Sequence, residues 1–195
     1  MKILKMKPEA STGVSLYDEQ TVLLDDGPKS VAYFCKTITT KVNRKIINEL
    51  KEVAGKFRGR DVRLCLHHGP QAPLHEMIVL GRASKYYRAH KHAKKEESFH
   101  MLEGRMGVVC FTDEGKVLDS CVLESEEDFI YRMSANTYHM VIPLTEVVIY
   151  KESKLGPFIP NANDSVYPAW APEDSSPEVK RYLQELIEGL NGKSK

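Results

Sequence analysis

A succession of short β-rich runs between Asp61 and about Glu152 most restricts how this chain can fold. Apolar residues there alternate with polar ones or form runs of a few residues, which is typical of strands. Asp113-Glu114-Gly115 joins two such runs as a hairpin turn would. Many short strands at close spacing indicate a sandwich or a barrel. The predicted strands are Val62–Leu66, Leu74–Leu80, Lys85–His92, Glu97–Leu102, Met106–Thr112, Val117–Leu123, Asp128–Met133, Thr137–Ile142 and Glu146–Glu152.

The periodicity changes on both sides of this β-rich stretch. Before it, Ser30–Cys35 is an apolar run that suits a strand, and apolar residues then recur at helical spacing, which predicts an amphipathic helix around 41–57. Pro177 suits a helix start, and the helical pattern after it predicts a second helix around 177–190.

We expect one domain, because a chain of 195 residues suits a single core with appended segments. In this interpretation residues 1–60 form an N-terminal extension and residues 61–153 form the barrel. Residues 154–195 pack on the barrel as an extended Pro/Trp segment and a helix, since Trp170 is too large to leave in water without cause.

Composition excludes several classes of partner. Lys+Arg 28 against Asp+Glu 27 gives a net charge of +1, which is no electrostatic footprint for nucleic acid. No apolar run approaches the roughly 20 residues of a membrane-spanning helix, and the basic N-terminus lacks the apolar region of a secretory signal. The four cysteines show no CxxC spacing, as expected for reduced thiols. We therefore expect a cytoplasmic protein without nucleic-acid partners.

The strongest chemical signal is the pair His90 and His92. On a strand their side chains share a face, roughly 6–7 Å apart, and can lean toward one ion. Glu97 is a better third ligand than Glu96, because an inward Glu97 also places apolar residues inward, namely Phe99 and Met101.

His139 is the predicted fourth ligand. It has the parity of Val141, so an inward His139 also belongs to an apolar face. Three imidazoles and a carboxylate suit one divalent ion of Fe, Mn, Ni, Co or Zn and can leave coordination positions open. The alternative is a metal-free pocket that holds an organic ligand.

These residues resemble the two motifs of the cupin superfamily. His90-Lys91-His92, Glu97 after four residues and Gly104 after six match the first motif. His139 ends a counterpart of the second motif, in which Asn136 replaces a glycine, a mild change because Asn tolerates the left-handed conformation. The leading glycine and trailing asparagine of the motifs are replaced by Ser84 and Pro143.

Within the cupins, roughly residues 60–175 look like the WbuC family. The resemblance lies in Glu97-Ser98-Phe99 with Gly104, Tyr138-His139 with Ile142-Pro143, and Gly156-Pro157-Phe158 with Trp170-Ala171-Pro172. It implies a mainly β cupin jelly-roll barrel (a double-stranded β-helix) with a bound divalent metal. The genes of this family lie among those for lipopolysaccharide O-antigen and other surface polysaccharides.

Other residues are candidates for catalytic or substrate-binding roles next to the metal. A tyrosine or histidine would move a proton, and aromatic and guanidinium groups would hold a sugar and a phosphate. The catalytic candidates are Tyr138, His67 and Tyr150, and the substrate-binding candidates are Arg63, Tyr87 and Arg132.

Three functions are compatible with these residues. The first is a metal-dependent enzyme that isomerises, epimerises or cleaves a sugar or sugar nucleotide in surface-polysaccharide biosynthesis. The second is a non-catalytic module with a structural metal that binds or senses a small molecule, with a carbohydrate-derived ligand expected. The third is an Fe(II) dioxygenase. By analogy with cupins we expect a homodimer in each case.

Overall fold

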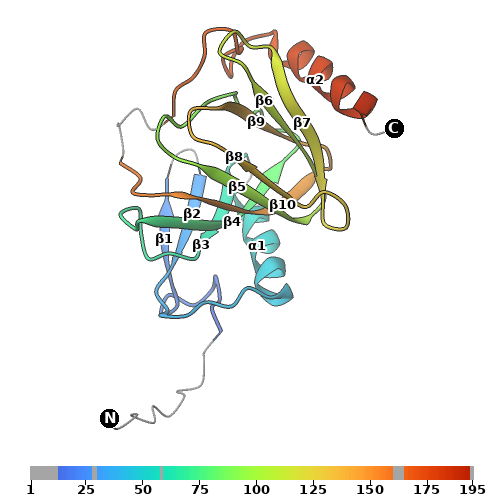
Figure 1. Ribbon diagram of the computed structural model, residues 1–195. Coiled ribbons are helices and arrows are strands. Elements are labelled where there is room, and N and C mark those ends of the chain that lie inside the picture. The colour runs from blue at the N-terminus through green and yellow to red at the C-terminus, as the bar shows by residue number, and fades with distance from the viewer. Residues whose placement is uncertain (1–12, 28–29, 58, 160–164, 194–195) are drawn as a thin grey trace.

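Two β-sheets face each other in the computed structural model, which describes residues 13–27, 30–57, 59–159 and 165–193 (Figure 1). The large sheet has the order β1-β2-β3-β4-β10-β5-β8 and the small sheet has the order β7-β6-β9. The large sheet contains β1 (Val22–Asp26), β2 (Ser30–Cys35), β3 (Asp61–Cys65), β4 (Leu74–Arg82), β5 (Glu97–Glu103), β8 (Ile130–Met133) and β10 (Val147–Leu155). The small sheet contains β6 (Arg105–Phe111), β7 (Val117–Glu124) and β9 (Tyr138–Pro143).

The space between the sheets is an apolar core, because alternate side chains of each strand point inward. Phe99 and Met101 of β5 pack there against residues of β6 and β9 such as Val108 and Val141. The mainly β jelly-roll fold expected from the sequence is therefore confirmed.

Helix α1 (Arg44–Lys56) covers the outer face of the large sheet. The Asn43 side chain caps its start by accepting a hydrogen bond from the Ile46 amide at 3.1 Å. The helix connects β2 to β3, which pair in parallel, whereas the other strand pairs are antiparallel. The predicted first helix is confirmed, and the segment expected as an N-terminal extension supplies two strands of the large sheet. Residues 1–12 of that segment lie outside the described residues.

Helix α2 (Val179–Lys193) covers the outer face of the small sheet, on the opposite side of the sandwich from α1 (Figure 1). Gly107 of β6 lies directly under it, and a Cβ atom at this position would overlap the side chain of Leu190. Trp170 packs beside this contact, and its indole donates a hydrogen bond to the Asp113 carbonyl at 3.0 Å. The predicted C-terminal helix and the packed Trp segment are both present.

The expected strand Lys85–His92 is wrong. Most of this segment lies outside the ladders, and only His90 and Lys91 form isolated bridges, to His139 and Val166. The reason is topological, because the segment leaves β4 of the large sheet and reaches β9 of the small sheet. The other strands predicted between residues 61 and 152 are present, with ends that differ slightly.

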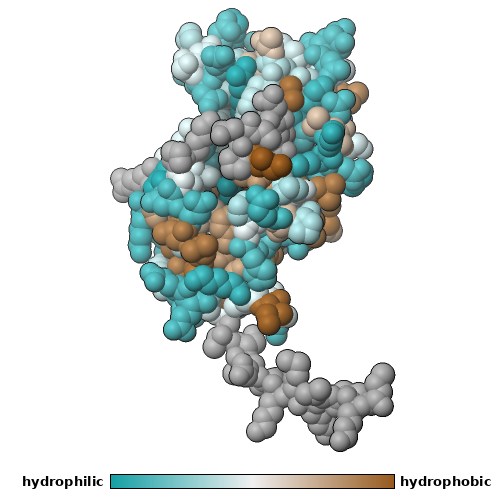
Figure 2. Space-filling model, turned by 90° about the vertical axis from the view of Figure 1, so that its left-hand side faces the viewer, coloured by the Kyte–Doolittle hydropathy of each residue, from teal (hydrophilic) through white to brown (hydrophobic). Residues whose placement is uncertain are grey.

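Apolar side chains also reach the surface, where they are scattered among hydrophilic ones on the face shown in Figure 2. Among the described helices, none is long and apolar enough to cross a membrane.

Candidate metal centre

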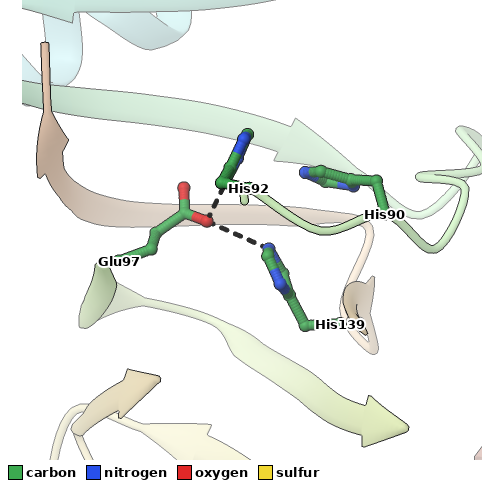
Figure 3. Close-up of side chains that lie close together, drawn as sticks. All are labelled: His90, His92, Glu97 and His139. Atoms are coloured by element: carbon green, nitrogen blue, oxygen red, sulfur yellow. Dashed lines mark ion pairs between the residues drawn. The ribbon is translucent and has the colours of Figure 1, made fainter. Parts of the chain in front are cut away.

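Four side chains from three separate segments converge between the two sheets (Figure 3). His90 and His92 lie on the segment after β4, Glu97 is the first residue of β5, and His139 is the second residue of β9. One ligand atom from each residue can be chosen so that all four lie within 4.8 Å of one another. The structure thus brings together the four residues that the sequence predicted as a ligand set.

Backbone hydrogen bonds hold the three segments in this arrangement. His90 and His139 exchange two of them, from the His90 amide to the His139 carbonyl at 3.0 Å and from the His139 amide to the His90 carbonyl at 2.9 Å. The Asn136 amide donates to the His92 carbonyl at 2.8 Å. Asn136 has a φ of 61°, so it occupies the left-handed conformation expected where the cupin motif has glycine. The turn before β9 therefore fixes the position of His139 relative to His90 and His92.

Two of the imidazoles are oriented by carbonyl groups. His90 Nδ1 lies 3.0 Å from the Arg88 carbonyl, and His139 Nδ1 lies 2.9 Å from the Thr137 carbonyl. A carbonyl oxygen can only accept, so each Nδ1 carries a proton, and in the neutral imidazole the lone pair is then on Nε2. This is the arrangement in which protein histidines bind metals, with the second ring nitrogen held by a backbone acceptor.

Two of the atoms that face the centre of the group, on Glu97 and His139, lack hydrogen-bond partners among the described residues. Glu97 Oε2 approaches His139 Nε2 at 3.0 Å, but neither atom has a hydrogen-bond partner, as expected for two acceptors. Both side chains are almost completely buried, with 4% and 2% of their residue surfaces exposed. Buried polar atoms without partners are costly, and a cation shared between them would satisfy both. The residues present therefore fit a divalent metal ion.

The charge states suit the same role. Burial alone would raise the pKa of the Glu97 carboxyl, but the Lys154 ammonium opposes this effect, and that pKa lies well below its usual range. Burial, with a smaller contribution from the neighbouring His139, lowers the pKa of His90 to about 4. At neutral pH the group thus offers a carboxylate and an unprotonated imidazole, which are the forms that bind metals.

A cavity of about 180 Å³ adjoins the four residues. Three predicted residues line it, namely Arg63 of β3, Tyr87 and Tyr150 of β10. Asp61, Glu152 and Lys154 line it as well and were missed from the sequence. The signal for two of them was parity, because Glu152 and Lys154 share the inward face of β10 with Tyr150.

Glu152 and Lys154 form a buried charge network with Glu97. Lys154 Nζ lies 2.7 Å from Glu152 Oε1 and 3.6 Å from Glu97 Oε1. Burial raises the pKa of Glu152, and the Glu97 charge adds to this effect, whereas Lys154 opposes it. The pKa of the Lys154 ammonium is raised by the two carboxylates despite its burial. The network keeps Glu97 ionised and fixes its direction.

Three predicted residues lie elsewhere. Tyr138 neighbours the inward His139 on β9, so it points to the outer face and packs on Trp170 with ring centroids 5.7 Å apart. His67 lies in a second small cavity, which shares Arg63 and Lys154 with the first, and it stacks on His75 with ring centroids 4.2 Å apart. Arg132 is exposed and forms an ion pair with Glu96. The structure does not bring these three residues into the group of four.

The fold and the site thus define a jelly-roll protein with a candidate metal centre. A family model described as a domain of unknown function, DUF6016, matches residues 42–123, which is less than half of the chain. The matched region includes His90, His92 and Glu97 and ends before His139. A comparison with curated proteins found no match.

Several solved structures are similar to this chain at low identity. The capsular polysaccharide assembling protein CapF from Staphylococcus aureus is 9% identical with a TM-score of 0.49, over 75% of this chain and 31% of that one. L-ribose isomerase from Cellulomonas parahominis is 13% identical with a TM-score of 0.45, over 56% and 70%. Oxalate decarboxylase from Lactobacillus farciminis is 16% identical with a TM-score of 0.40, over 49% and 26%. The chain spans about a third of the length of CapF, and none of these similarities is close enough to assign a function.

Proposed function

We propose that this protein is a metal-dependent cupin in which His90, His92, Glu97 and His139 hold one divalent transition-metal ion. The observation that carries the proposal is the buried cluster of ligand atoms within 4.8 Å, with two imidazoles fixed so that Nε2 is unprotonated. The chemistry of the donor set admits Fe, Mn, Ni, Co or Zn.

The reaction that suits this site best is isomerisation, epimerisation or cleavage of a small carbohydrate-derived ligand. When bound, the ion would act as a Lewis acid toward a carbonyl or hydroxyl oxygen. The chain itself supplies Tyr150, a buried phenol in the cavity wall whose pKa is raised by burial and by Glu152. A phenol that keeps its proton at neutral pH can donate it to a substrate oxygen. Lys154 holds Glu97 and Glu152 in place beside it.

The size of the cavity limits which ligands it can enclose. About 180 Å³ is below the roughly 300–1,000 Å³ of sites that enclose drug-sized molecules. A single sugar unit matches this space better than a whole sugar nucleotide, whose nucleotide would have to lie outside. A place in lipopolysaccharide O-antigen or surface-polysaccharide biosynthesis, as for the WbuC family, is part of this proposal and is supported by the motif resemblance alone.

Metal analysis of protein purified without a chelating tag tests the centre. We expect close to one equivalent of a divalent transition metal in the wild type and a large loss in the double variant of His90→Ala and His139→Ala. His100→Ala on the same strand as Glu97 is the matched control, because His100 packs against Phe129 away from the cluster. Wild-type protein that takes up no metal would refute the proposal.

Turnover is tested separately with a panel of sugars and sugar nucleotides. Product formation that requires metal supports the enzyme, whereas a thermal shift without product supports the ligand-binding alternative. Oxygen consumption dependent on Fe(II) and substrate would instead support a dioxygenase.

A further inference from the structure

Arg63 lines the cavity that adjoins the metal centre, and no ion pair joins it to any residue in the described part of the chain. It lies on β3 and lines the same cavity as His90, Glu97 and His139. Among the residues that the structure describes, Arg63 forms no ion pair, and its buried Nε has no hydrogen-bond partner. A buried guanidinium nitrogen without an acceptor is costly, so its retention here calls for an acceptor that the protein does not provide.

The other charged groups of the cavity wall are already paired. Lys154 is held by Glu152 and Glu97. Asp61 forms an ion pair with Lys85 and accepts a hydrogen bond from the Tyr87 hydroxyl at 2.8 Å. Arg63 is therefore the cavity-lining cation that stays available for a ligand.

Charge balance points the same way. The two carboxylates Glu97 and Glu152 offset the two cations Arg63 and Lys154, and the Asp61–Lys85 pair is neutral. A bound divalent ion would therefore leave the cavity with about two net positive charges. Such an excess of positive charge favours an anionic ligand over a neutral one.

We infer that the ligand of this site is a carbohydrate-derived carboxylic acid, or a closely related small acid, whose carboxylate is bound by Arg63 while its other end reaches the metal. A guanidinium matches a carboxylate in a planar, two-hydrogen-bond geometry, which a neutral sugar cannot offer. The inference rests on the proposed function, because it places the second end of the ligand at the metal centre.

The test uses the full chain loaded with Co(II) and two 2-hydroxy diacids of different length, malate and 2-hydroxyglutarate. Each diacid is compared with its ω-amide, which keeps the metal-chelating end and loses the far charge. Calorimetry measures the affinity, and the visible absorption of Co(II) reports whether the chelating end reaches the metal. We expect at least one diacid to bind about ten-fold or more tightly than its amide.

In Arg63→Gln we expect the diacid and its amide to bind with affinities within about two-fold of each other. The metal content and the affinity for the amide should stay unchanged. Arg63→Met, which also removes the charge, should behave in the same way and serves if the glutamine variant does not fold. The control is Arg132→Gln, an exposed arginine outside the cavity, which should keep the full preference.

The outcomes separate this inference from the proposed function. Wild-type protein that fails to bind Co(II) would refute the proposed function and this inference with it. Bound Co(II) with no diacid binding, with equal affinity for diacids and amides, or with a preference that survives in Arg63→Gln would overturn this inference alone.

Discussion

Glu97 supplies the carboxylate of the candidate metal centre, and its neighbour Glu96 offers a matched comparison. Glu97 is 4% exposed and faces the three histidines, whereas Glu96 is exposed and paired with Arg132. Glu97→Gln keeps the side-chain shape and removes the charge that the ion needs. The loss of a residue that only supports a metal ligand weakens metal binding about 10–100-fold. We therefore expect Glu97→Gln, which changes a ligand itself, to lower the metal affinity at least about 100-fold.

Competition with a chromophoric chelator measures the affinity in this comparison. Glu96→Gln should bind metal as the wild type does. Equal affinities of the two variants would show that Glu97 is not a ligand.

His67 has no place at the metal, but its position makes the stability of the fold sensitive to acid. Burial, with a smaller contribution from the stacked His75, lowers the pKa of His67 to about 4. The unfolded chain, with a histidine pKa near 6.5, binds the proton first as the pH falls. His67 therefore contributes a loss of stability between pH about 6.5 and about 4, and none above that window.

Urea unfolding of metal-free protein at pH 7 and pH 5 measures this effect. We expect the wild type to lose more stability between the two values than His67→Gln, which cannot take up the proton. Parallel losses in both proteins would contradict the assigned shift.

Among the elements, helix α2 depends on one glycine of the small sheet. A Cβ atom at Gly107 would overlap Leu190, so Gly107→Val should push α2 off β6 and cost about 1–3 kcal/mol in the free energy of unfolding. Gly189→Ala on the same helix is the control, because its Cβ would meet nothing within 4 Å. There we expect a gain of about 0.5–1 kcal/mol from helix propensity.

Urea denaturation followed by far-UV circular dichroism measures both variants. An unchanged Gly107→Val protein would mean that α2 does not pack on β6 as described.

Sequence patterns predicted the elements well because each depends on local periodicity. Strand parity selected Glu97 with Phe99 and Met101, and both helices follow from their apolar stripes. The pairing of strands depends instead on residues far apart in the sequence. Local periodicity therefore could not predict that β2 and β3 pair in parallel, or that the segment before His90 lies outside the ladders.

The charged residues of the cavity wall were not predicted from the sequence for a different reason. Glu152 and Lys154 resemble a solvated pair when the strand is considered alone, and their burial becomes visible only once Glu97 lies beside them. Tyr138 shows the reverse error, because adjacency to His139 in sequence places it on the opposite face of β9.

For the whole molecule, the metal would join segments of both sheets. Glu97 belongs to the large sheet and His139 to the small one. An ion bound only by the folded state at a free concentration about 100 times its dissociation constant stabilises by about 2.7 kcal/mol. Chelation should therefore lower the unfolding temperature of the wild type by roughly 5–10 °C.

Scanning calorimetry with and without a strong chelator checks this expectation. The His90→Ala and His139→Ala double variant should unfold at the same temperature in both conditions. An unfolding temperature of the wild type that does not change with the chelator would argue against a bound metal that stabilises the fold.

The homodimer expected for a cupin stays a prediction. Helix α1 buries its apolar stripe on the large sheet, whereas the stripe of α2 on the small sheet is only partly buried except at Leu190. The partly exposed stripe of α2 is thus a surface that a second subunit could cover, and sedimentation velocity measures whether a dimer forms.

The loose segment that carries His90 and His92 has a kinetic consequence. It is tied to β9 by one bridge, to the turn before β9 by the Asn136 amide and to Val166 by a second bridge, whereas Glu97 and His139 lie in continuous ladders. Segments with few backbone hydrogen bonds open locally at a fraction of the free energy of global unfolding. One such opening would withdraw two of the four ligands together. We therefore expect the residence time of the ion to follow the exchange of the His90 amide hydrogen rather than the unfolding rate of the barrel.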